Sequence, residues 1–412
     1  MVRFARLVPS VGLWLFVLSL PILNGCGGGA LPASQPQSAA PPAGTPSSSA
    51  PSVVAYVFTL DSVKQTASEF ALSSVGKLQA TTQSVPYALP VATDHGVVYP
   101  VPGQSAGNSV ALQSYALQED GSLQPEGGPA TYPQDKTSTL VSDNTYVYAV
   151  SDEGIFGFTD QRTGLTPLPA SQQTVPSPCP PAQENIQYGC GYSAALMLSN
   201  GNAFLSERNI PPYGTENTFP QLSEFTRVQG QLTDQQLISS YVGTYLITAT
   251  PDGRFLYLLE WISNRILRYN IGNGTALIYS PLSNGQQLQS PGTESLFVTP
   301  NGKFLLASIQ NGASPGQVRV FQIDSSSGNL TEISGSPFST GENYLQNMAL
   351  DPTGHYLLGV HSACSASADP NCSTPGRLVA MSIDSSTEVM SVTSDVADGV
   401  EPRQVTAALV SQ

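Results

Sequence analysis

Thr250-Pro251-Asp252-Gly253-Arg254-Phe255-Leu256 is the stretch that decides the fold, because two further copies of it follow at nearly constant spacing. Each copy has an apolar strand, a tight turn built on Pro-x-Gly, and a second apolar strand. The central turn residues Asp252, Asn301 and Thr353 are 49 and 52 residues apart. A period of about 50 residues is that of one four-stranded propeller blade. The later copies are Thr299-Pro300-Asn301-Gly302-Lys303-Phe304-Leu305 and Asp351-Pro352-Thr353-Gly354-His355-Tyr356-Leu357.

Weaker copies of the same phrase precede these three. Their turns are Asp94-His95-Gly96, Asp143-Asn144 and Asn200-Gly201-Asn202, and their inner strands are expected over 87–91, 138–141 and 194–198. Alternating third strands follow the clear repeats, as at 265–271 and 317–323. The phrase therefore predicts six inner strands.

The two ends of the folded region supply a seventh blade. Residues 403–410 have the form of an inner strand, and residues 53–58 have the form of a second strand. Pairing the two would close a ring and remove a free sheet edge. We predict an all-β, seven-bladed β-propeller closed by its N- and C-terminal strands, with six or eight blades as alternatives.

Composition and net charge narrow the classes of function that the protein can have. The chain has 412 residues, of which 11% are charged, and a formal net charge of −14. Few charges with much Gly and Pro suit an all-β exported protein. The acidic balance would repel phosphate backbones, so nucleic acid is excluded as a partner. We find no phosphate loop, zinc-ligand pair or calcium loop, and therefore expect no cofactor and no metal; we expect a monomer.

Residues 1–25 are predicted to be a lipoprotein signal peptide. Arg3 and Arg6 precede an apolar stretch over 7–23, and Leu23-Asn24-Gly25-Cys26 resembles a bacterial lipobox, which makes Cys26 the lipidated residue. An ordinary cleaved signal and a short membrane anchor are the alternatives. Gly27 after the Cys favours, by resemblance, the outer membrane. We expect a chain anchored in the bacterial envelope, on its periplasmic or surface face.

Residues 26–52 are predicted to be a flexible tether. They consist of Gly, Ala, Ser, Pro, Gln and Thr and offer almost nothing large to bury. Residues 53–412 then form the propeller domain. Two local pairs of cysteines within it, Cys179 with Cys190 and Cys364 with Cys372, are expected to form disulfides in an oxidising compartment. Metal binding or free thiols are the alternatives.

The repeat pattern over residues 53–412 resembles the lactonase family of seven-bladed propellers, which includes propeller-type 6-phosphogluconolactonases, and shares its blade phrase with YVTN surface-layer repeats. The resemblance implies a site at one mouth of the central channel. It is marked by Pro-His-His and Pro-Arg-His phrases before inner strands and by a Glu after a second strand. Fold transfers across such families more safely than function does.

Two positions match the family phrases. Glu260, at the end of 257–260, falls on the functional Glu, and Arg403 falls on the Arg of the phrase leading into an inner strand. Their carboxylate and guanidinium could bind an anionic sugar acid and polarise a lactone carbonyl, so they are the candidate catalytic pair. The competing interpretation pairs Glu260 with Arg265 or Arg268 as a simple strand-end ion pair.

Three more residues are candidate ligand contacts. Glu207 and Arg208 occupy the corresponding strand end one blade earlier, so that two Glu residues at one blade position could form an acidic ring at the mouth. Trp261 could cover such a site with an aromatic face suited to sugars. The alternative for Trp261 is a partly buried packing residue.

Histidine is missing where the family carries it. The three inner strands are preceded by 243–246, 292–295 and 344–347, none of which contains His. His95, His355 and His361 lie after inner or second strands and are expected to be exposed loop residues rather than bases. Since lactone hydrolysis near neutral pH needs a proton-transfer group, we expect a binding or interaction module for a carbohydrate or envelope-protein ligand. A lactonase using Glu260 and Arg403, and a structural surface protein, are the alternatives.

Overall fold

A computed structural model describes the chain from residue 51 to residue 410, with gaps. The described ranges are 51–101, 110–132, 139–143, 145–151, 154–169, 175–176, 191–197, 201–208, 222–238, 244–260, 265–271, 278–280, 295–309, 314–363, 375–384 and 389–410. Within these ranges all regular structure is β-strand, and no helix is long and apolar enough to cross a membrane. Cys26 and the predicted cysteine pairs Cys179 with Cys190 and Cys364 with Cys372 lie outside the described residues.

The described residues contain thirty strands, joined in part by turns. They are β1 (Val53–Asp61), β2 (Thr66–Ser73), β3 (Leu78–Ala80), β4 (Val91–Ala92), β5 (Val97–Val101), β6 (Val110–Leu117), β7 (Leu123–Tyr132), β8 (Thr139–Ser142), β9 (Tyr146–Ser151), β10 (Gly154–Gln161), β11 (Gly164–Pro167), β12 (Val175–Pro176), β13 (Gly191–Met197), β14 (Asn202–Arg208), β15 (Leu222–Val228), β16 (Gln231–Ile238), β17 (Thr244–Ala249), β18 (Phe255–Glu260), β19 (Arg265–Asn270), β20 (Ile278–Ser280), β21 (Leu296–Val298), β22 (Phe304–Ile309), β23 (Pro315–Ile323), β24 (Leu330–Glu332), β25 (Phe338–Asn343), β26 (Leu345–Leu350), β27 (Tyr356–His361), β28 (Gly376–Ile383), β29 (Met390–Asp398) and β30 (Pro402–Ala408).

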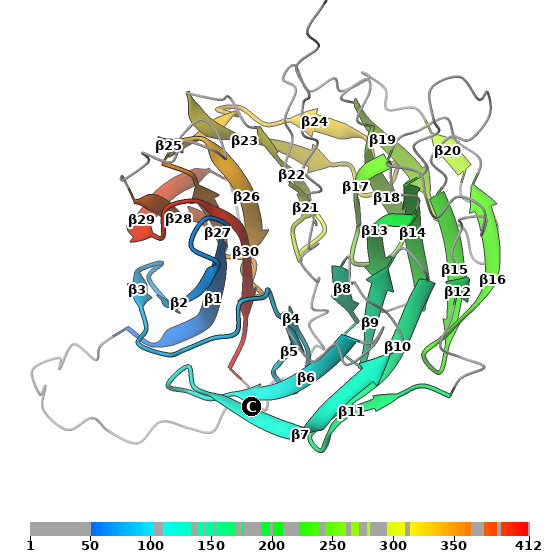
Figure 1. The fold of residues 1–412 in the computed structure, drawn as a ribbon. Coiled ribbons are helices and arrows are strands. Elements are labelled where there is room, and N and C mark those ends of the chain that lie inside the picture. Colours follow the sequence, from blue (N-terminus) through cyan, green and yellow to red (C-terminus); the bar gives the residue numbers. More distant parts are fainter. Residues whose placement is uncertain are drawn as a thin grey trace, which may run out of the picture.

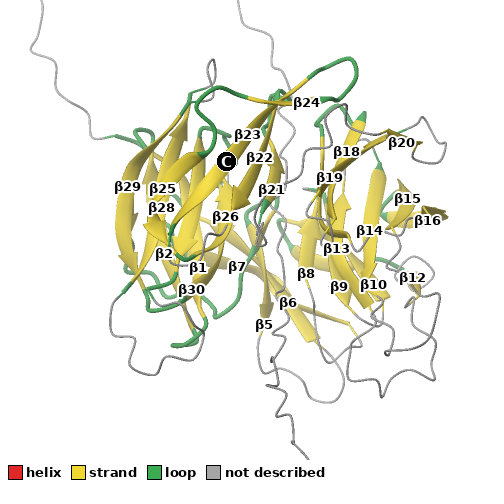
Figure 2. Ribbon diagram, turned by 90° about the horizontal axis from the view of Figure 1, so that it is seen from above, coloured by secondary structure: helices red, strands yellow, loops and turns green. Residues whose placement is uncertain are grey.

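These strands form seven antiparallel sheets around one axis, which confirms the predicted seven-bladed propeller (Figure 1). We call them blade 1 (β4–β7), blade 2 (β8–β12), blade 3 (β13–β16), blade 4 (β17–β20), blade 5 (β21–β25), blade 6 (β26–β29) and the closing blade (β30, β1, β2, β3). The inner strands β4, β8, β13, β17, β21, β26 and β30 surround the centre of the ring. Figure 2 shows the sheets standing side by side when the ring is seen from the edge.

The closing blade joins the two ends of the folded region, as predicted. The inner strand β30 pairs antiparallel with β1, with Tyr56 opposite Ala408 and Thr59 opposite Val405. Pairing satisfies backbone groups that a free edge would leave exposed. One inner strand is shorter than expected. Of the predicted strand over 87–91 only Val91 is in β4, and Pro86 and Pro90, which lack an N–H, frame the part that stays irregular.

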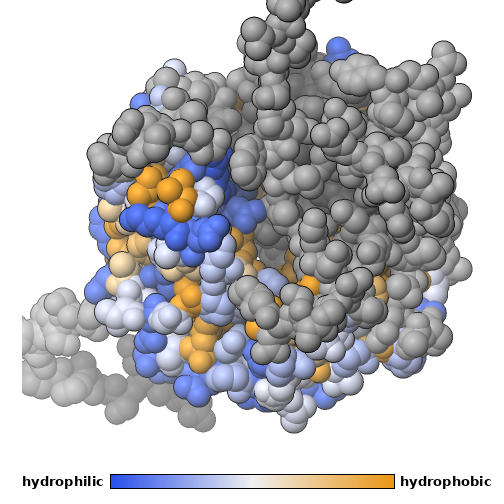
Figure 3. Space-filling model, viewed as in Figure 1, coloured by the Kyte–Doolittle hydropathy of each residue, from blue (hydrophilic) through white to orange (hydrophobic). Residues whose placement is uncertain are grey.

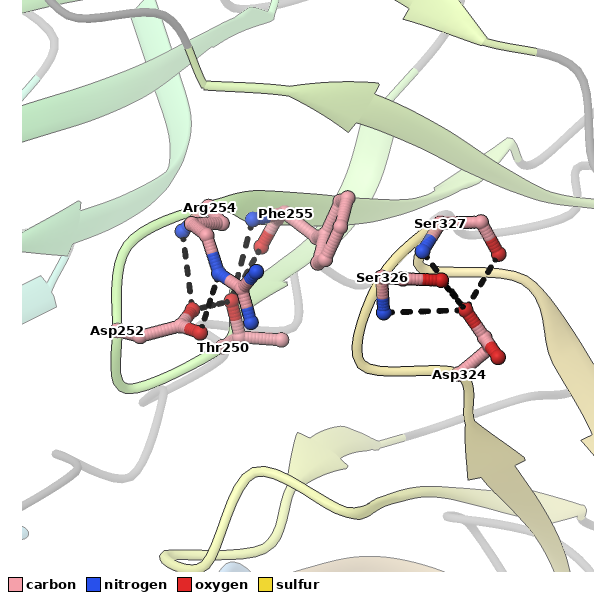
Figure 4. Close-up of polar contacts among 7 residues, drawn as sticks. All are labelled: Thr250, Asp252, Arg254, Phe255, Asp324, Ser326 and Ser327. Atoms are coloured by element: carbon pink, nitrogen blue, oxygen red, sulfur yellow. Dashed lines mark hydrogen bonds and ion pairs between the residues drawn. The ribbon is translucent and has the colours of Figure 1, made fainter.

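The Pro-x-Gly turns share one hydrogen-bonding scheme, which Figure 4 shows for the turn at residues 250–255. Thr250 Oγ1 accepts from the Phe255 backbone N–H at 3.1 Å and donates to Asp252 Oδ1 at 2.6 Å, and Asp252 Oδ1 accepts from the Arg254 N–H at 3.1 Å. Thr299 and Asn301 repeat these contacts in blade 5, and in blade 6 the Asp351 carboxylate takes the place of the Thr hydroxyl. The glycines of these turns have φ of 66°, 70° and 73°, a left-handed conformation that disfavours other residues.

The blades pack through apolar side chains that alternate between the two faces of each second strand. Tyr257 and Leu259 face blade 5, while Leu256 and Leu258 face blade 3. All four are buried. Burial of this kind is the main favourable contribution to folding. The outermost strands are instead amphipathic, as in β29, and Figure 3 shows hydrophilic residues interspersed with hydrophobic ones on the part of this face that is not grey.

A recurring polar contact links neighbouring blades. A tyrosine hydroxyl from the second strand of one blade donates to a backbone carbonyl in the outer hairpin of the next. The four pairs are Tyr56 to Glu119 at 2.6 Å, Tyr148 to Gly230 at 2.8 Å, Tyr257 to Gly328 at 2.8 Å, and Tyr356 to Ser74 at 2.8 Å. Because each tyrosine ring is buried or nearly so, its hydroxyl needs such a partner.

Candidate functional site at the mouth of the ring

Four inner strands have a β-bulge near the point where they begin. We call this end of the ring axis the mouth. Pairing with the second strand skips Ser193 in β13, Tyr245 in β17, Gln346 in β26 and Arg403 in β30. These four residues therefore occupy one structural position in four blades, which we call the bulge position. Bulges re-aim side chains and are common next to binding sites.

Arg403 at the bulge position is held by two neighbours. Its Nη1 donates to Gln346 Oε1 at 2.8 Å, which joins the bulge positions of the closing blade and blade 6. Its Nη2 forms an ion pair with Glu401 Oε1, and the other oxygen of Glu401 accepts from Ser62 Oγ at 3.0 Å. The Arg403 side chain is 19% exposed and the Glu401 side chain 6% exposed. The guanidinium is thus fixed in orientation, and its charge is balanced by a buried carboxylate.

The residue after the bulge ties neighbouring inner strands together. Ser295 Oγ accepts from the Met348 backbone N–H at 3.0 Å, and Asn347 Oδ1 accepts from the Val405 N–H at 3.4 Å. Asn347 directly follows a bulge position, and Ser295 aligns with it in blade 5. Val405 and Met348 both lie two residues after a bulge position. These side chains hold the mouth residues of blades 5, 6 and the closing blade in a fixed mutual arrangement.

A second position common to several blades is the end of the second strand. Strand register places Glu207 opposite Tyr192, Glu260 opposite Thr244, His361 opposite Leu345 and Asp61 opposite Pro402, each beside the bulge. Glu207 and Glu260 therefore stand at one blade position in the backbone. Their side chains, that of Arg208 and the whole of Trp261 are outside the described residues.

Two described residues show what this strand-end position does. Asp61 Oδ2 accepts from the Val400 backbone N–H at 2.5 Å, and His361 Nδ1 contacts the Asn343 carbonyl oxygen at 3.0 Å. Val400 and Asn343 each lie three residues before the bulge position. Both strand-end side chains therefore hold the connection that leads into an inner strand.

His361 corrects the expectation of an exposed loop histidine. It is the last residue of β27 and only 1% exposed. Burial lowers its pKa to about 4, outweighing the Asn343 hydrogen bond and the charge of Asp395, which raise it. The ring is neutral near pH 7, and Nδ1 must carry the proton because it faces a carbonyl oxygen. The burial of His361 could not be predicted from its sequence neighbours, because it follows from the register of β27 against β26.

The other two histidines lie in turns. His355 is exposed, and its Nδ1 lies 3.0 Å from Thr353 Oγ1. His95 is in the β4–β5 turn, where it is half-buried rather than exposed. Neither belongs to an inner strand. The described part of the chain holds no group of His, Cys, Asp and Glu that could bind a metal ion.

The two arginines proposed as partners of Glu260 have different surroundings. Arg265 is exposed and lies opposite Glu260 in the β18–β19 pairing. Arg268 lies opposite Tyr257 instead and donates from Nη1 to Asn329 Oδ1 of blade 5 at 2.6 Å. Register thus leaves Arg265 as the cross-strand neighbour of Glu260.

Sequence reasoning missed three residues of the mouth, Gln346, Glu401 and Tyr344. Gln346 and Tyr245 stand at the same distance before the central turn residues Thr353 and Asp252. This correspondence points to a functional position only once the bulge is known. Glu401 stands two residues before Arg403, and nothing in the sequence marks it as the ion-pair partner of that residue. Tyr344 has φ of 52°, and its unusual backbone could not be read from residue type.

The seven blades, the closing strand pair and a polar mouth define a lactonase-like seven-bladed β-propeller. Residues 215–368 match the family model described as lactonase, 7-bladed beta-propeller. The chain thus resembles this family, as the blade phrase predicted. A search of curated proteins finds no match.

Solved structures of the same fold cover most of the chain. A proposed 6-phosphogluconolactonase from Bacteroides fragilis is 17% identical with a TM-score of 0.60, over 86% of this chain and 98% of its own. The periplasmic gluconolactonase of Pseudomonas aeruginosa is 14% identical with a TM-score of 0.60, over 87% and 100%. A protein from Lactobacillus plantarum is 14% identical with a TM-score of 0.63, over 86% and 99%. At such identities these likenesses show the fold alone.

Proposed function

We propose that this protein is an envelope-anchored propeller that binds a small polar ligand at its mouth, as a binding module rather than a hydrolase. The observation that carries the proposal is the network of Arg403, Gln346 and Glu401, which joins two blades and presents fixed hydrogen-bonding groups. Preorganised polar groups of this kind bind ligands with little loss of side-chain freedom. The same network argues against the anionic ligand expected from the sequence, because Glu401 already neutralises Arg403.

The absence of a suitable base among the described residues supports binding over hydrolysis. The histidine nearest the inner-strand connections, His361, is buried and holds the Asn343 carbonyl through Nδ1. Its lowered pKa reflects that environment. A general base must be able to reach the proton that it takes and return it. The His361 imidazole, fixed in this way, supports the structure and does not act as a base.

Lactone hydrolysis is the second candidate. It is favoured by the match of residues 215–368 to the lactonase family model and by the fold shared with a periplasmic gluconolactonase. In that case Glu260, at the end of β18, would act with Arg403. The substrate would be a sugar-acid lactone, which is uncharged at the reacting ring.

An activity panel separates the two candidates. Purified protein is incubated with glucono-δ-lactone, its 6-phosphate and acyl lactones, and product acid is followed by pH-stat. We expect no turnover above the uncatalysed rate. Turnover that Glu260→Gln abolishes would establish the hydrolase and remove the binding-only proposal.

A binding experiment tests the mouth directly. Calorimetric titration with glucono-δ-lactone and neutral hexoses should show binding that the double variant Arg403→Met/Glu401→Gln weakens at least about tenfold, since it removes both charged members together. Removing both partners avoids a buried unpaired carboxylate. Arg377→Met, which removes a partly exposed ion pair with Asp395 on blade 6, is the matched control and should bind normally.

The anchor and the disulfides are separate proposals supported by sequence alone. If Cys26 is lipidated, Cys26→Ser should lose incorporation of labelled fatty acid and move to the soluble fraction. Mass spectrometry of an unreduced digest should show Cys179 joined to Cys190 and Cys364 joined to Cys372. Any crossed pairing would contradict the assignment.

A further inference from the structure

Asn301 is an exposed asparagine in the Pro-x-Gly turn of blade 5, directly before Gly302. Its Oδ1 accepts from Thr299 Oγ1 at 2.7 Å and from the Lys303 backbone N–H at 3.0 Å. Its Nδ2 makes no hydrogen bond to the described part of the chain. The turn therefore holds the oxygen of this side-chain amide and leaves its nitrogen unheld.

The arrangement around Asn301 suits attack on its side-chain carbonyl carbon, Cγ. The backbone nitrogen of Gly302 follows directly in the chain, and glycine has no side chain to hinder its approach. Attack places negative charge on Oδ1, where the Thr299 hydroxyl and the Lys303 N–H already donate, as the donors of an oxyanion hole do. The Gly302 N–H donates to the Thr299 carbonyl at 2.8 Å, and this bond must open before attack.

The turn of blade 4 shows that an aspartate fits at this position (Figure 4). Asp252 Oδ1 accepts from Thr250 Oγ1 at 2.6 Å and from the Arg254 N–H at 3.1 Å, which are the contacts that Asn301 makes in blade 5. Asp252 Oδ2 also forms an ion pair with Arg254 Nε at 2.6 Å. Lys303 stands where blade 4 has Arg254, so a carboxylate in place of the Asn301 amide would gain a cationic neighbour.

We propose that Asn301 is a site of self-modification, at which its side-chain amide is converted to the carboxylate of aspartate. The Gly302 nitrogen forms a bond to Asn301 Cγ, the Cγ–Nδ2 bond breaks, and ammonia leaves with the proton that Gly302 loses. Water then adds to Cγ and the bond from Cγ to the Gly302 nitrogen breaks, which restores the peptide N–H and leaves a carboxyl group. Water is the co-reactant, and nothing is oxidised or reduced.

The surrounding structure favours aspartate over isoaspartate as the product. Water that opens the cyclic intermediate at the main-chain carbonyl of Asn301 would give isoaspartate, which adds a methylene group to the backbone of the turn. The turn has little room for it, because a Cβ on Gly302 would lie 3.3 Å from Pro251 Cδ of blade 4. A longer backbone would also displace the Gly302 N–H from the Thr299 carbonyl. Opening at Cγ keeps both contacts.

Mass spectrometry of the full-length protein, kept folded in mildly alkaline buffer, tests the conversion. Peptides that contain Asn301 should gain about 1 Da in ordinary water and about 3 Da in water labelled with oxygen-18, mainly as aspartate. Asn329, in the β23–β24 hairpin but followed by Leu330, is the internal control and should keep its mass. The reference is the same protein unfolded in guanidinium chloride. Slower conversion of Asn301 in the folded protein than in this reference would overturn the proposal.

Variants of Thr299 test the role of the donors on Oδ1. Thr299→Val removes the hydroxyl and should slow the conversion of Asn301 about tenfold, whereas Thr299→Ser keeps it and should stay within about threefold of the wild-type rate. Asn301→Gln should abolish the conversion, because its longer side chain would have to close a larger ring. An unchanged or faster rate in Thr299→Val would show that the turn does not promote the attack.

The stability of Asn301→Asp tests whether the turn accepts the product. Its urea unfolding midpoint should be at least that of the wild type, because the contacts on Oδ1 are kept and the carboxylate faces a cationic neighbour. Any gain should shrink in high salt, which screens the new charge pair. A midpoint clearly below that of the wild type, or isoaspartate as the main product of the folded protein, would overturn the assignment of aspartate as the product that the turn retains.

Discussion

At the scale of single residues, each Pro-x-Gly turn depends on one polar side chain in front of the proline. Thr250 is 3% exposed, and its hydroxyl caps the Phe255 N–H and orders Asp252. Thr250→Val keeps the shape of the side chain but removes the hydroxyl, so that the buried Phe255 N–H loses this acceptor. We expect a loss of about 1–2 kcal/mol in the free energy of unfolding, measured by urea titration.

Thr331→Val is the control for this prediction. Thr331 lies in β24 of blade 5 and is exposed, so the same chemical change should alter stability by less than about 0.5 kcal/mol. Equal losses for the two variants would mean that the turn hydrogen bond contributes nothing specific.

Residue types near the mouth could be predicted only in part. Arg403 was found because Pro-Arg stands before an inner strand, and the structure places it at the bulge position. His361 was misjudged because its burial depends on the connection packed against β27. Tyr344 was missed because a positive φ is imposed by surrounding hydrogen bonds and leaves no trace in the residue itself.

At the scale of elements, the blades are linked by tyrosine hydroxyls. Tyr257→Phe removes the 2.8 Å bond to the Gly328 carbonyl and leaves that acceptor in a buried interface. We expect a loss of about 1 kcal/mol in unfolding free energy. Tyr99→Phe is a matched control, because the Tyr99 hydroxyl is buried in a similar interface without a hydrogen-bond partner among the described residues.

The Tyr99→Phe variant should be neutral or slightly more stable than the wild type, since it removes an unsatisfied buried group. Chemical denaturation of both variants side by side measures the difference. A Tyr99→Phe protein as unstable as Tyr257→Phe would contradict the role given to the interblade bond.

Strands were predictable from sequence where the turn phrase was intact. Blades 4, 5 and 6 carry the Pro-x-Gly turns, and their first and second strands lie where the phrase predicted. In blade 1 the phrase is degenerate, and prolines cut the inner strand to Val91–Ala92. The bulges were not predictable, because an extra residue in one strand shows only against the register of its partner.

At the scale of the whole molecule, a buried carboxyl group lies at each of the two interfaces between the closing blade and its neighbours. At the interface with blade 1, Glu69 of β2 is 3% exposed, and a Cβ on Gly121 would lie 2.5 Å from its Oε1. At the interface with blade 6, Asp398 of β29 is 3% exposed beside Thr59 and Ser68. Burial raises the pKa of Glu69 to about 7 and that of Asp398 to about 6.

The raised pKa values of Glu69 and Asp398 make the folded propeller less stable as pH rises. The folded protein keeps protons that the unfolded chain has already released, so the free energy of unfolding falls between about pH 4 and pH 7. For Glu69 the full effect is at most about 3 kcal/mol. Urea unfolding of wild type and Glu69→Gln across this range should show the difference between them changing by about 2–3 kcal/mol.

Glu119→Gln controls for a general charge effect. Glu119 is exposed in the neighbouring blade 1 hairpin, so its variant should follow the wild-type profile within about 0.5 kcal/mol at every pH. A Glu69→Gln profile parallel to that of the wild type would show that Glu69 does not hold a proton in the folded state.

Ring closure itself can be removed. Deleting residues 402–412 takes away β30, with the buried residues Val405, Ala407 and Ala408, and exposes the edge of β1. We expect loss of the cooperative unfolding transition and aggregation, measured by circular dichroism and size-exclusion chromatography. Deleting only 411–412 should leave both measurements unchanged.

The pairing of β1 with β30 also sets an order of events during biogenesis. Ser62 and Glu401, which meet at this seam, are 339 residues apart in sequence. A chain threaded through a translocation pore from its N-terminal side would deliver β1 long before β30. Until the last segment emerged, strands β1 to β3 would have no partner for the free edge of β1, and an unpaired edge promotes aggregation. If the protein is exported as proposed, factors that shield exposed strands would be needed until the last segment has emerged and the propeller has closed.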